Sequence, residues 1–421
     1  MPRNKQKQRI TAKFIGQSFL KNYETTKPLS GAYAVSEAMR QIEPDVVAAY
    51  PITPQTPIVE RFSQFIADGI IKTEFVPVES EHSAMSTVVG ASAAGARAMT
   101  ATSSVGLALM FEVVNAASGM RLPIVMPVVN RALSSPINIH CDHSDTMACR
   151  DAGWIQLYSE NPQEAYEHTI LAIRLAEHPD IQLPTMVAQD GFITSHAVEN
   201  VNLLKDKLVK KFVGQRKPIQ SLLLSKKPVT FGALQLPDYF FETKRQQQYG
   251  MEMTLKHYGK IAKELSELTG NKYPMFEAYK LKDAEAAIVA LNSSAGTIKK
   301  VVDDMRKVGK KVGLLKIRLF RPFNYAKAYA LLKNVPNIGV LDRSYSFGAH
   351  PPVYSEILSA LSYQNNARNS ALSSNAQSNN VFSFVYGLGG RELYEAQVYQ
   401  TFEKLLKGKL GKGINYIGLR E

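Results

Sequence analysis

The fold is decided by the stretch DVVAAYPITPQTP, which runs from Asp45 to Pro57. Its four consecutive apolar residues, Val46 to Ala49, predict a buried strand. The strand leads into a loop with three prolines and two threonines, and an amphipathic helix is expected from Pro57 onward. In open α/β sheets, ligands bind in the crevice outside the carboxyl ends of the strands. The loop after Ala49 is therefore where we expect the chemistry of the protein.

Two prolines stiffen this loop. Pro51 and Pro54 each fix φ and remove a backbone donor, which holds Thr53 in place. Thr56 and Pro57 predict a helix start, with threonine as the N-cap and proline at the first helical position. The local alternative is a proline-rich turn before a capped helix, without any function of its own.

Short β-rich runs alternate with helical patterns from Gly31 to about Ser195, which predicts parallel βαβ units. The expected strands are Val46–Tyr50, Glu74–Val78, Ala98–Thr102, Pro123–Val129, Ile155–Tyr158 and Thr185–Gln189. The expected helices are Ser30–Ile42, Pro57–Asp68, Ser83–Gly95, Gly106–Ser118 and Pro162–Glu177. A second unit follows, with strands Ala286–Asn292, Lys311–Arg318, Ile338–Asp342 and Val381–Tyr386 and helices near Gly296–Val308, Tyr325–Leu332 and Val353–Leu361.

These patterns divide the chain into five parts. They are a basic N-terminal arm over 1–27, a first α/β domain over 28–200, a connector over 201–270, a smaller α/β domain over 271–405, and a C-terminal tail over 406–421. A helix through Glu242–Leu268 is expected in the connector. Residues 363–380 are rich in Asn, Ser, Gln and Ala and are predicted to be a disordered surface insertion, because they have too little apolar content to fold.

The composition is that of a soluble globular protein, with 45% hydrophobic and 21% charged residues in a chain of 421. No run reaches the ~18 apolar residues that a membrane-spanning helix needs. A secretory signal requires an uninterrupted apolar region after its basic start, and no such region follows the basic N-terminus here. Cys141 and Cys149 cannot build a disulfide framework or hold an iron–sulfur cluster, which usually takes four thiolates. We expect a cytoplasmic protein without a membrane span.

The net charge of +13 is unevenly distributed. Residues 28–201 carry 8 Lys+Arg and 19 Asp+Glu, a balance of −11, whereas residues 1–27 carry +6 and residues 202–421 carry +18. A basic surface can attract nucleic acid, an acidic lipid or an acidic protein. No zinc-finger spacing, aromatic RNA-binding signature or Gly-rich basic tract favours nucleic acid. An acidic protein partner or a complementary subunit is the better interpretation.

Two carboxylates follow the second predicted strand, at Glu79 and Glu81, next to His82. Acidic residues favour helix N-termini, where they complement the helix dipole. A capping role and a catalytic role at the sheet edge therefore both stay open. The helix that follows, Ser83–Gly95, is almost without bulky side chains, and we expect it to be buried against another helix or a second subunit.

Three further segments carry polar chemistry. Arg131, after Asn130 at a strand end, offers a planar fork for a carboxylate or phosphate; the alternative is a salt bridge to a nearby acidic residue. The segment from His140 to Asp145 holds potential metal ligands, but they are contiguous and match no zinc spacing, so a polar active-site loop is favoured and no metal site is predicted. The GLGGR segment from Gly387 could cradle an anion, but it lacks the GxGxxG and GxxxxGK[ST] patterns.

Several motifs occur in one order along the chain: YPITP (50–54), VESEHSA (78–84), NRALS (130–134), DHSD (142–145), DAGWIQ (151–156), QDGFITSH (189–196), LPDY (236–239) and GLGGR (387–391). Together they resemble the α subunits of the pyruvate:ferredoxin oxidoreductase (pyruvate synthase) family, among the 2-oxoacid:ferredoxin oxidoreductases. The resemblance covers nearly the whole chain from Gly31 to Arg391. The block from Asn130 to Asp145 resembles the pyruvate type rather than the 2-oxoglutarate or indolepyruvate types.

The resemblance implies a thiamine diphosphate enzyme that is active only as a multi-subunit complex. Its fold would be the doubly wound parallel α/β sheet of the domain that faces the cofactor's pyrimidine, followed by a smaller domain like the C-terminal domain of transketolases. A β subunit would hold the diphosphate and its Mg²⁺, and other chains, with γ and δ subunits among them, would hold the iron–sulfur clusters. The implied reaction converts pyruvate and coenzyme A to acetyl-CoA and CO₂ and reduces ferredoxin, or runs in reverse.

The resemblance also assigns residues. Glu81 matches the glutamate that contacts N1′ of the aminopyrimidine, so that the neighbouring imino nitrogen can take the proton from thiazolium C2. Thr53 matches the threonine that hydrogen-bonds the substrate, and Arg131 matches the arginine that pairs with the substrate carboxylate. An active-site loop is expected to contain Asn130, Asp142 and His143.

Two alternative functions stay open. One is another 2-oxoacid:ferredoxin oxidoreductase that acts on a branched-chain 2-oxoacid. The other is a non-catalytic basic scaffold subunit that keeps the fold and binds an acidic partner. The presence of Thr53, Glu81 and Arg131 together argues against a scaffold.

Overall fold

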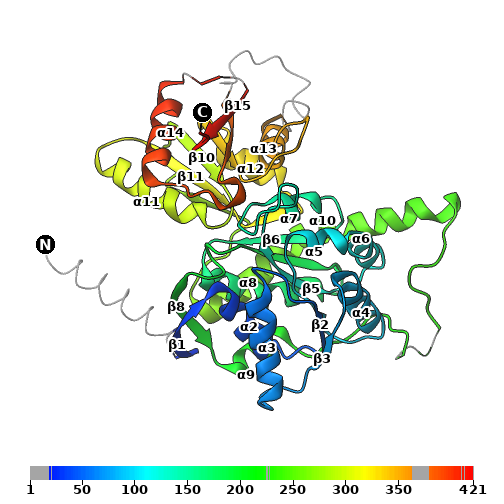
Figure 1. Ribbon diagram of the computed structural model, residues 1–421. Coiled ribbons are helices and arrows are strands. Elements are labelled where there is room, and N and C mark those ends of the chain that lie inside the picture. The colour runs from blue at the N-terminus through cyan, green and yellow to red at the C-terminus, as the bar shows by residue number, and fades with distance from the viewer. Residues whose placement is uncertain are drawn as a thin grey trace, which may run out of the picture.

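The computed structural model describes residues 19, 21–223, 226, 228–362, 379–408, 410–411 and 413–420. Most of the predicted basic arm, and residues 363–378 of the predicted insertion, lie outside the described residues. The described residues form two α/β units, each built on its own sheet (Figure 1). The predicted α/β fold class is confirmed.

Among the described residues, the first sheet has seven strands in the order β12-β6-β7-β5-β4-β2-β3. All pairs are parallel except β12 with β6, so the carboxyl ends of six strands meet at one edge. The bounds are β2 (Val46–Ala49), β3 (Glu74–Pro77), β4 (Ala98–Met99), β5 (Val125–Asn130), β6 (Ile155–Ser159), β7 (Thr185–Asp190) and β12 (Leu319–Arg321). Val129 packs in one apolar cluster and Val128 in another, so β5 is buried on both faces, which explains its unbroken apolar sequence.

Helices cover both faces of this sheet. One layer contains α2 (Gly31–Ile42), α3 (Thr56–Ala67), α8 (Pro162–Ala176), α9 (Asp206–Val213) and the C-terminal part of α10 (Pro237–Thr269). The other layer contains α4 (Glu81–Ala93), α5 (Ser104–Leu109) and α6 (Phe111–Gly119). Figure 1 shows α4 and α6 on the side of the sheet opposite to α8. Among the described residues, no helix has the length and apolar content needed to cross a bilayer.

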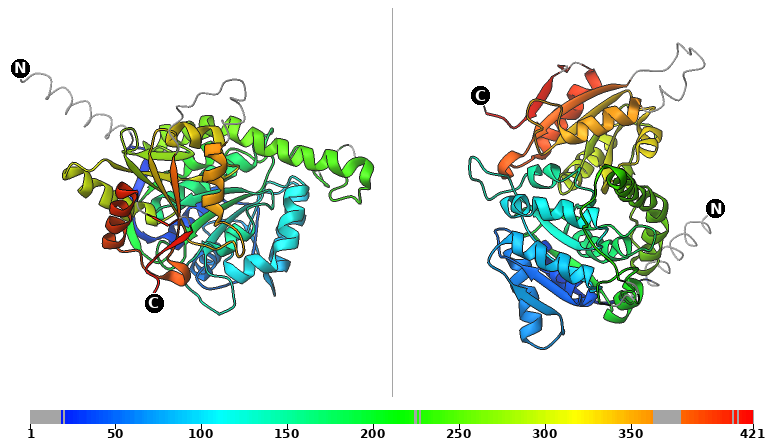
Figure 2. Two further views of the ribbon diagram at one scale, coloured as in Figure 1. Left: turned by 90° about the horizontal axis from the view of Figure 1, so that it is seen from above. Right: turned by 90° about the vertical axis from the view of Figure 1, so that its right-hand side faces the viewer.

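The second sheet has six strands among the described residues, in the order β15-β14-β13-β10-β11-β9, with β9 antiparallel to its neighbour. The bounds are β9 (Phe276–Tyr279), β10 (Ala286–Ala290), β11 (Val312–Ile317), β13 (Asn337–Asp342), β14 (Asn380–Tyr386) and β15 (Ile414–Ile417). Its helices are α11 (Ser294–Lys307), α12 (Tyr325–Leu332), α13 (Pro352–Ser362) and α14 (Glu395–Lys407), with a 3₁₀ turn, η1, at Leu388–Gly390. The pair α11 and α14 covers one face, and the pair α12 and α13 covers the other (Figure 2).

Several predicted boundaries differ from the structure. The strand β1 (Tyr23–Ser30) starts inside the predicted arm and pairs antiparallel with β8 (Val198–Leu204), which the boundary at residue 200 had cut. The strand β12 follows the second domain in sequence but joins the first sheet. The strand β15 lies in the predicted tail but completes the second sheet. Each of these strands is short or an edge strand, so its local pattern is weak.

Two helix starts also differ from the predictions. Thr56 is the first residue of α3, and Gln55 stands at the N-cap position, so the prediction of Thr56 as N-cap was wrong. The helix α4 begins at Glu81, two residues earlier than predicted, because the Ser80 side chain accepts a hydrogen bond from the Ser83 N–H at 3.2 Å.

Candidate active site

The predicted site residues lie at the carboxyl edge of the first sheet. Thr53 follows β2, Glu81 follows β3 and Arg131 follows β5, and these strands are parallel members of one sheet. The edge is the place where open α/β sheets bind ligands. Thr53 and Arg131 contact each other directly, since Arg131 Nη1 donates to the Thr53 carbonyl at 3.0 Å.

The loop that carries Thr53 is fastened from behind by Gln55, a residue that is fully buried. Gln55 Nε2 donates to the Ala101 carbonyl after β4 at 2.9 Å, and Gln55 Oε1 accepts from the Ile52 N–H at 3.2 Å. Thr53 itself is exposed. The loop is therefore anchored through Gln55, and the Thr53 side chain stays free to meet a ligand.

Arg131 is 6% exposed, and backbone carbonyls hold its guanidinium. Besides the bond to Thr53, Nε donates to the Asn138 carbonyl at 3.0 Å. No carboxylate of the described residues pairs with this guanidinium, so the salt bridge that the sequence left open is not found there. A nearly buried cation without a counter-ion at a ligand-binding edge suits a carboxylate ligand.

Glu81 begins α4 and is 7% exposed. Gly106 of α5 makes room for it: a Cβ at that position would lie 2.6 Å from Glu81 Oε1 and 2.6 Å from Thr102 Oγ1. Within the described part of the chain, no hydrogen bond or ion pair reaches the Glu81 carboxylate, and the buried Thr102 hydroxyl also lacks a partner. The two groups form a polar site that can bond to a ligand.

Asp145 fixes the backbone around Arg131. Its carboxylate accepts from the N–H groups of Arg131 and Ser104, each at 3.0 Å, and from Asn130 Nδ2 at 2.7 Å. Burial raises the pKa of the Asp145 carboxyl to about 6, against the opposing effect of these hydrogen bonds. Asp145 thus ties the end of β5 to the start of α5.

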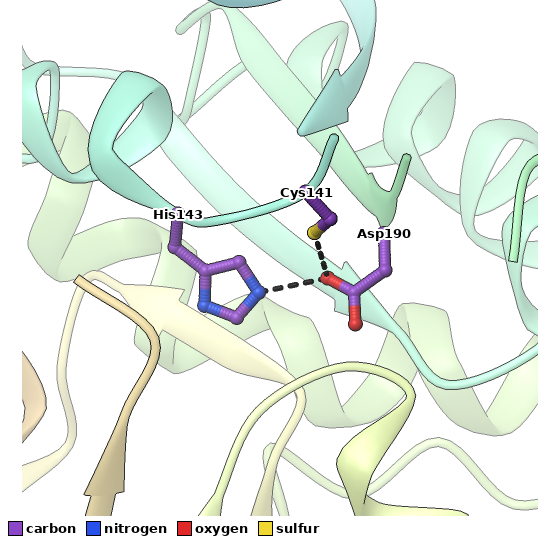
Figure 3. Close-up of side chains that lie close together, drawn as sticks. All are labelled: Cys141, His143 and Asp190. Carbon is purple, nitrogen blue, oxygen red and sulfur yellow. Dashed lines mark hydrogen bonds and ion pairs between the residues drawn. The ribbon is translucent and has the colours of Figure 1, made fainter. Parts of the chain in front are cut away.

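Asp190, at the end of β7, is the centre of a buried cluster at the contact between the two domains (Figure 3). Its carboxylate accepts from His143 Nε2 at 2.8 Å and faces the Cys141 thiol at 3.3 Å. From the second domain it accepts from Arg343 Nη1 at 3.0 Å and Asn292 Nδ2 at 2.9 Å. The hydroxyl of Ser293 also donates to it.

Charge and hydrogen bonding keep this carboxylate ionised. Burial alone would raise the pKa of the Asp190 carboxyl, but Arg343 and His143 hold that pKa well below its usual range. Burial also raises the pKa of the Cys141 thiol well above its usual value. Cys141, His143 and Asp190 are residue types that bind zinc, yet the Arg343 guanidinium already neutralises the carboxylate and would repel a cation. The cluster is a hydrogen-bonded junction between the domains.

Of the residues predicted for an active-site loop, Asn130 and His143 take part in this junction. His143 and Asn130 are fully buried, and Asn130 Oδ1 accepts from Asn292 Nδ2 at 3.2 Å. Asp142 accepts from the Ser144 N–H at 2.9 Å, at the start of α7 (Ser144–Ala148). The glycine-rich turn η1 also packs here, where the Gly390 N–H donates to the Cys141 carbonyl at 2.6 Å. In this structure, these groups support the loop behind Arg131.

Comparison with known proteins now gives the family. Residues 37–263 match the family described as "Pyruvate flavodoxin/ferredoxin oxidoreductase, thiamine diP-bdg", and residues 284–398 match "Pyruvate:ferredoxin oxidoreductase core domain II". The chain is 58% identical to pyruvate synthase subunit PorA of Thermotoga maritima over 394 residues, which are 93% of this chain and 98% of the relative. The chain belongs to the pyruvate:ferredoxin oxidoreductase family.

Two other proteins that are similar to this chain extend the comparison. Ketoisovalerate oxidoreductase subunit VorA of Pyrococcus abyssi is 40% identical over 94% of this chain and 98% of its own length. The solved 2-oxoglutarate:ferredoxin oxidoreductase of Magnetococcus marinus shares the fold, with a TM-score of 0.69 at 19% identity. The match covers 90% of this chain and 65% of that longer chain.

The family's thiamine diphosphate fits the residues at this edge. The Glu81 carboxylate is nearly buried and lacks a partner among the described residues, which suits a carboxylate that shares a proton with a ring nitrogen. Gly106 leaves the space in front of it, which any side chain with a Cβ would narrow.

Reasoning from the sequence missed four residues that shape this pyruvate:ferredoxin oxidoreductase site: Gln55, Gly106, Asp145 and Asp190. Three of them stand at strand ends or in quoted motifs, so their positions gave a signal. The sequence did not indicate their hydrogen-bond partners, because these lie far away along the chain: Arg343, which donates to Asp190, comes 153 residues later. Only the folded chain brings these groups together.

Proposed function

We propose that this chain is the α subunit of a pyruvate:ferredoxin oxidoreductase. The complex would convert pyruvate and coenzyme A to acetyl-CoA and CO₂ with reduction of ferredoxin, or run in the reverse direction. The observation that carries the proposal is Arg131, a nearly buried guanidinium without a carboxylate partner among the described residues, which is bonded to the loop of Thr53. The family and the 58% identity to a pyruvate synthase subunit support the same reading.

Each residue has a stated task in this proposal. Arg131 pairs with the carboxylate of pyruvate, and the Thr53 hydroxyl donates a hydrogen bond to the same substrate, so that its keto carbon is held in one orientation. Glu81 shares a proton with N1′ of the aminopyrimidine and stabilises the tautomer in which the neighbouring nitrogen is a base. Bound thiamine diphosphate would supply the carbon nucleophile and the electron sink for decarboxylation.

The supporting residues hold this geometry. Asp145 fixes the backbone of Arg131, and Asp190 joins the loop behind it to the second domain. Both carboxylates are fully buried and act through other residues, so they are positioning residues in this scheme.

Other chains would supply what this chain lacks. Its two cysteines are both buried, and iron–sulfur clusters usually take four thiolates, so the clusters would lie on other subunits of the complex. A β subunit would hold the diphosphate and Mg²⁺, and γ and δ subunits would complete the route of electrons to ferredoxin.

A second candidate substrate is a branched-chain 2-oxoacid, which the 40% identity to a ketoisovalerate oxidoreductase subunit favours. The reconstituted complex should be assayed with pyruvate and with 2-oxoisovalerate under coenzyme A saturation. We expect a higher kcat/KM for pyruvate. A higher value for 2-oxoisovalerate would overturn the pyruvate assignment and favour the second candidate.

A further inference from the structure

The segment from Gly214 to Tyr249 exposes an unusual amount of apolar surface. We call this segment the arm; it is distinct from the basic N-terminal arm over 1–27. It contains nine of the 23 large hydrophobic side chains that are exposed among the described residues. They are Ile219, Leu222, Leu223, Leu234, Leu236, Tyr239, Phe240, Phe241 and Tyr249. Large apolar side chains exposed together in one segment mark sites of protein interaction.

The arm includes the first part of α10, which projects from the molecule. Buried positions of α10 begin only at Gly250, and its contacts with α6 begin at about Lys244, so residues 237–243 project roughly 10 Å beyond the packed part of the helix. Figures 1 and 2 show this part of α10 standing out beyond the helices α4 and α6. The consecutive residues Tyr239, Phe240 and Phe241 are 70%, 53% and 78% exposed and point around the helix. Exposed aromatic side chains on several sides of one helix are unusual in a soluble protein, so a partner is expected to cover this end of α10.

The arm is fastened to the layer of α4 and α6, which fixes its position. The Leu222 N–H donates to the Ala93 carbonyl at the end of α4 at 2.9 Å. Gln247 Nε2 donates to Ser118 Oγ of α6 at 2.9 Å. The outer side of α4 is also open, because a Cβ at Gly90 would meet no atom within 4 Å. Glu81 begins α4 and Ala93 ends it, roughly 18 Å along the helix, so a partner that covers the whole length of α4 reaches the candidate site.

The arm is basic as well as apolar. Its sequence has six Lys+Arg and two Asp+Glu, a balance of +4, and the exposed residues Lys217 and Lys244 flank, in sequence, the apolar side chains from Ile219 to Phe241. A partner that fits it has an apolar groove with an acidic rim. A second copy of this chain is the less suitable occupant, because the two chains would each carry a net charge of +13.

We propose that the arm is a docking surface for the β subunit, the subunit that completes the candidate site beside Glu81. The inference rests on the proposed function only in taking that subunit as the partner. The aromatic side chains of the arm enter an apolar groove of the β subunit, and the lysines face its acidic rim. The arm thereby clamps the partner over the outer side of α4.

The test uses the full chain, tagged and co-expressed with the β subunit. The arm variant carries Tyr239→Ala, Phe240→Ala and Phe241→Ala. The matched control carries Val308→Ala, Phe347→Ala and Leu419→Ala, three side chains of the second domain that are 72%, 92% and 65% exposed. A charge variant, Lys217→Glu with Lys244→Glu, tests the acidic rim without removing apolar surface. Retained β subunit is measured after affinity purification at low and at physiological salt, together with the thermal midpoint of each variant.

We expect the arm variant to lose about tenfold or more of its affinity for the β subunit. The control should retain the partner. The charge variant should retain less of it than the unaltered chain at low salt, and this deficit should narrow at physiological salt, because salt screens the repulsion between the new glutamates and the acidic rim. Unchanged retention by the arm variant would overturn the proposal. It would also be overturned if the chain alone is a dimer by light scattering and the arm variant makes it a monomer, because a second copy would then be the occupant. The Glu81→Gln variant separates the two ideas: it should keep the β subunit even if turnover is lost.

Discussion

The substitution Asp190→Asn tests the junction between the two domains. The change keeps the shape of the side chain but removes the negative charge that faces Arg343, a residue that is 3% exposed. Breaking a buried ion pair by removing one partner costs about 3–5 kcal/mol, because the other charge stays buried without a counter-ion. The new amide also places a donor against His143, Asn292 or Arg343, all of which donate to the carboxylate. We therefore expect a loss of about 3–5 kcal/mol in the free energy of unfolding.

The measurement is equilibrium unfolding in guanidinium chloride, followed by the fluorescence of Trp154. This residue is the single tryptophan of the chain and is fully buried in the first domain. Asp190→Asn is compared with Arg343→Met and with the double variant. The double variant should lose less than the sum of the two single losses, because it leaves no unpaired buried charge. A loss below about 1 kcal/mol for Asp190→Asn, or single losses that add within ~0.5 kcal/mol, would refute this account of the junction.

Three other predictions concern the site and the pH dependence of stability. Gly106→Ala should reduce turnover while the chain stays folded, because its Cβ would lie 2.6 Å from Glu81 Oε1; Gly259→Ala, in α10, where a Cβ would meet no atom within 4 Å, is the matched control. Arg131→Lys should raise KM for pyruvate by about tenfold or more, since an ammonium cannot form the two parallel bonds of the guanidinium, and an unchanged KM would contradict the assigned role. Burial raises the pKa of the Glu167 carboxyl to about 7, from an ordinary value of 4.5. The stability that this group contributes is therefore complete below about pH 4.5 and is lost as the pH rises through about 7, a change of ~3 kcal/mol. Glu167→Gln should flatten that decline in unfolding curves between pH 4.5 and 8, whereas Glu199→Gln, on an exposed residue, should keep it.

The sequence predicted the parts of the fold that have strong local patterns. The apolar run Val46–Ala49 and the helix after it were visible because burial on both faces leaves an unbroken apolar strand. The strand β12 escaped prediction because three residues carry little pattern, and its partner β6 lies more than 150 residues earlier in the chain.

The same distinction applies to the site. Thr53, Glu81 and Arg131 each follow the end of a predicted parallel strand, so the pattern of strands was enough to suggest that they lie at one edge of the sheet. Asp142 and His143 were expected in an active-site loop because they are polar and follow a strand end. The sequence did not indicate that His143 lies buried against Asp190, where Asn292, Ser293 and Arg343 of the second domain complete a junction. Contacts between domains leave no periodicity in a sequence.

The central claim is that this chain supplies the glutamate of a thiamine diphosphate site. Turnover of the reconstituted complex with Glu81→Gln tests it most directly, with Glu79→Gln as the control, because Glu79 is exposed and bonds to Ser83 Oγ at 2.5 Å. The account predicts that Glu81→Gln lowers kcat by about 10²–10⁴-fold while the complex stays assembled, and that Glu79→Gln leaves it nearly unchanged. A complex with Glu81→Gln that turns over pyruvate at the rate of the unaltered protein would contradict the account.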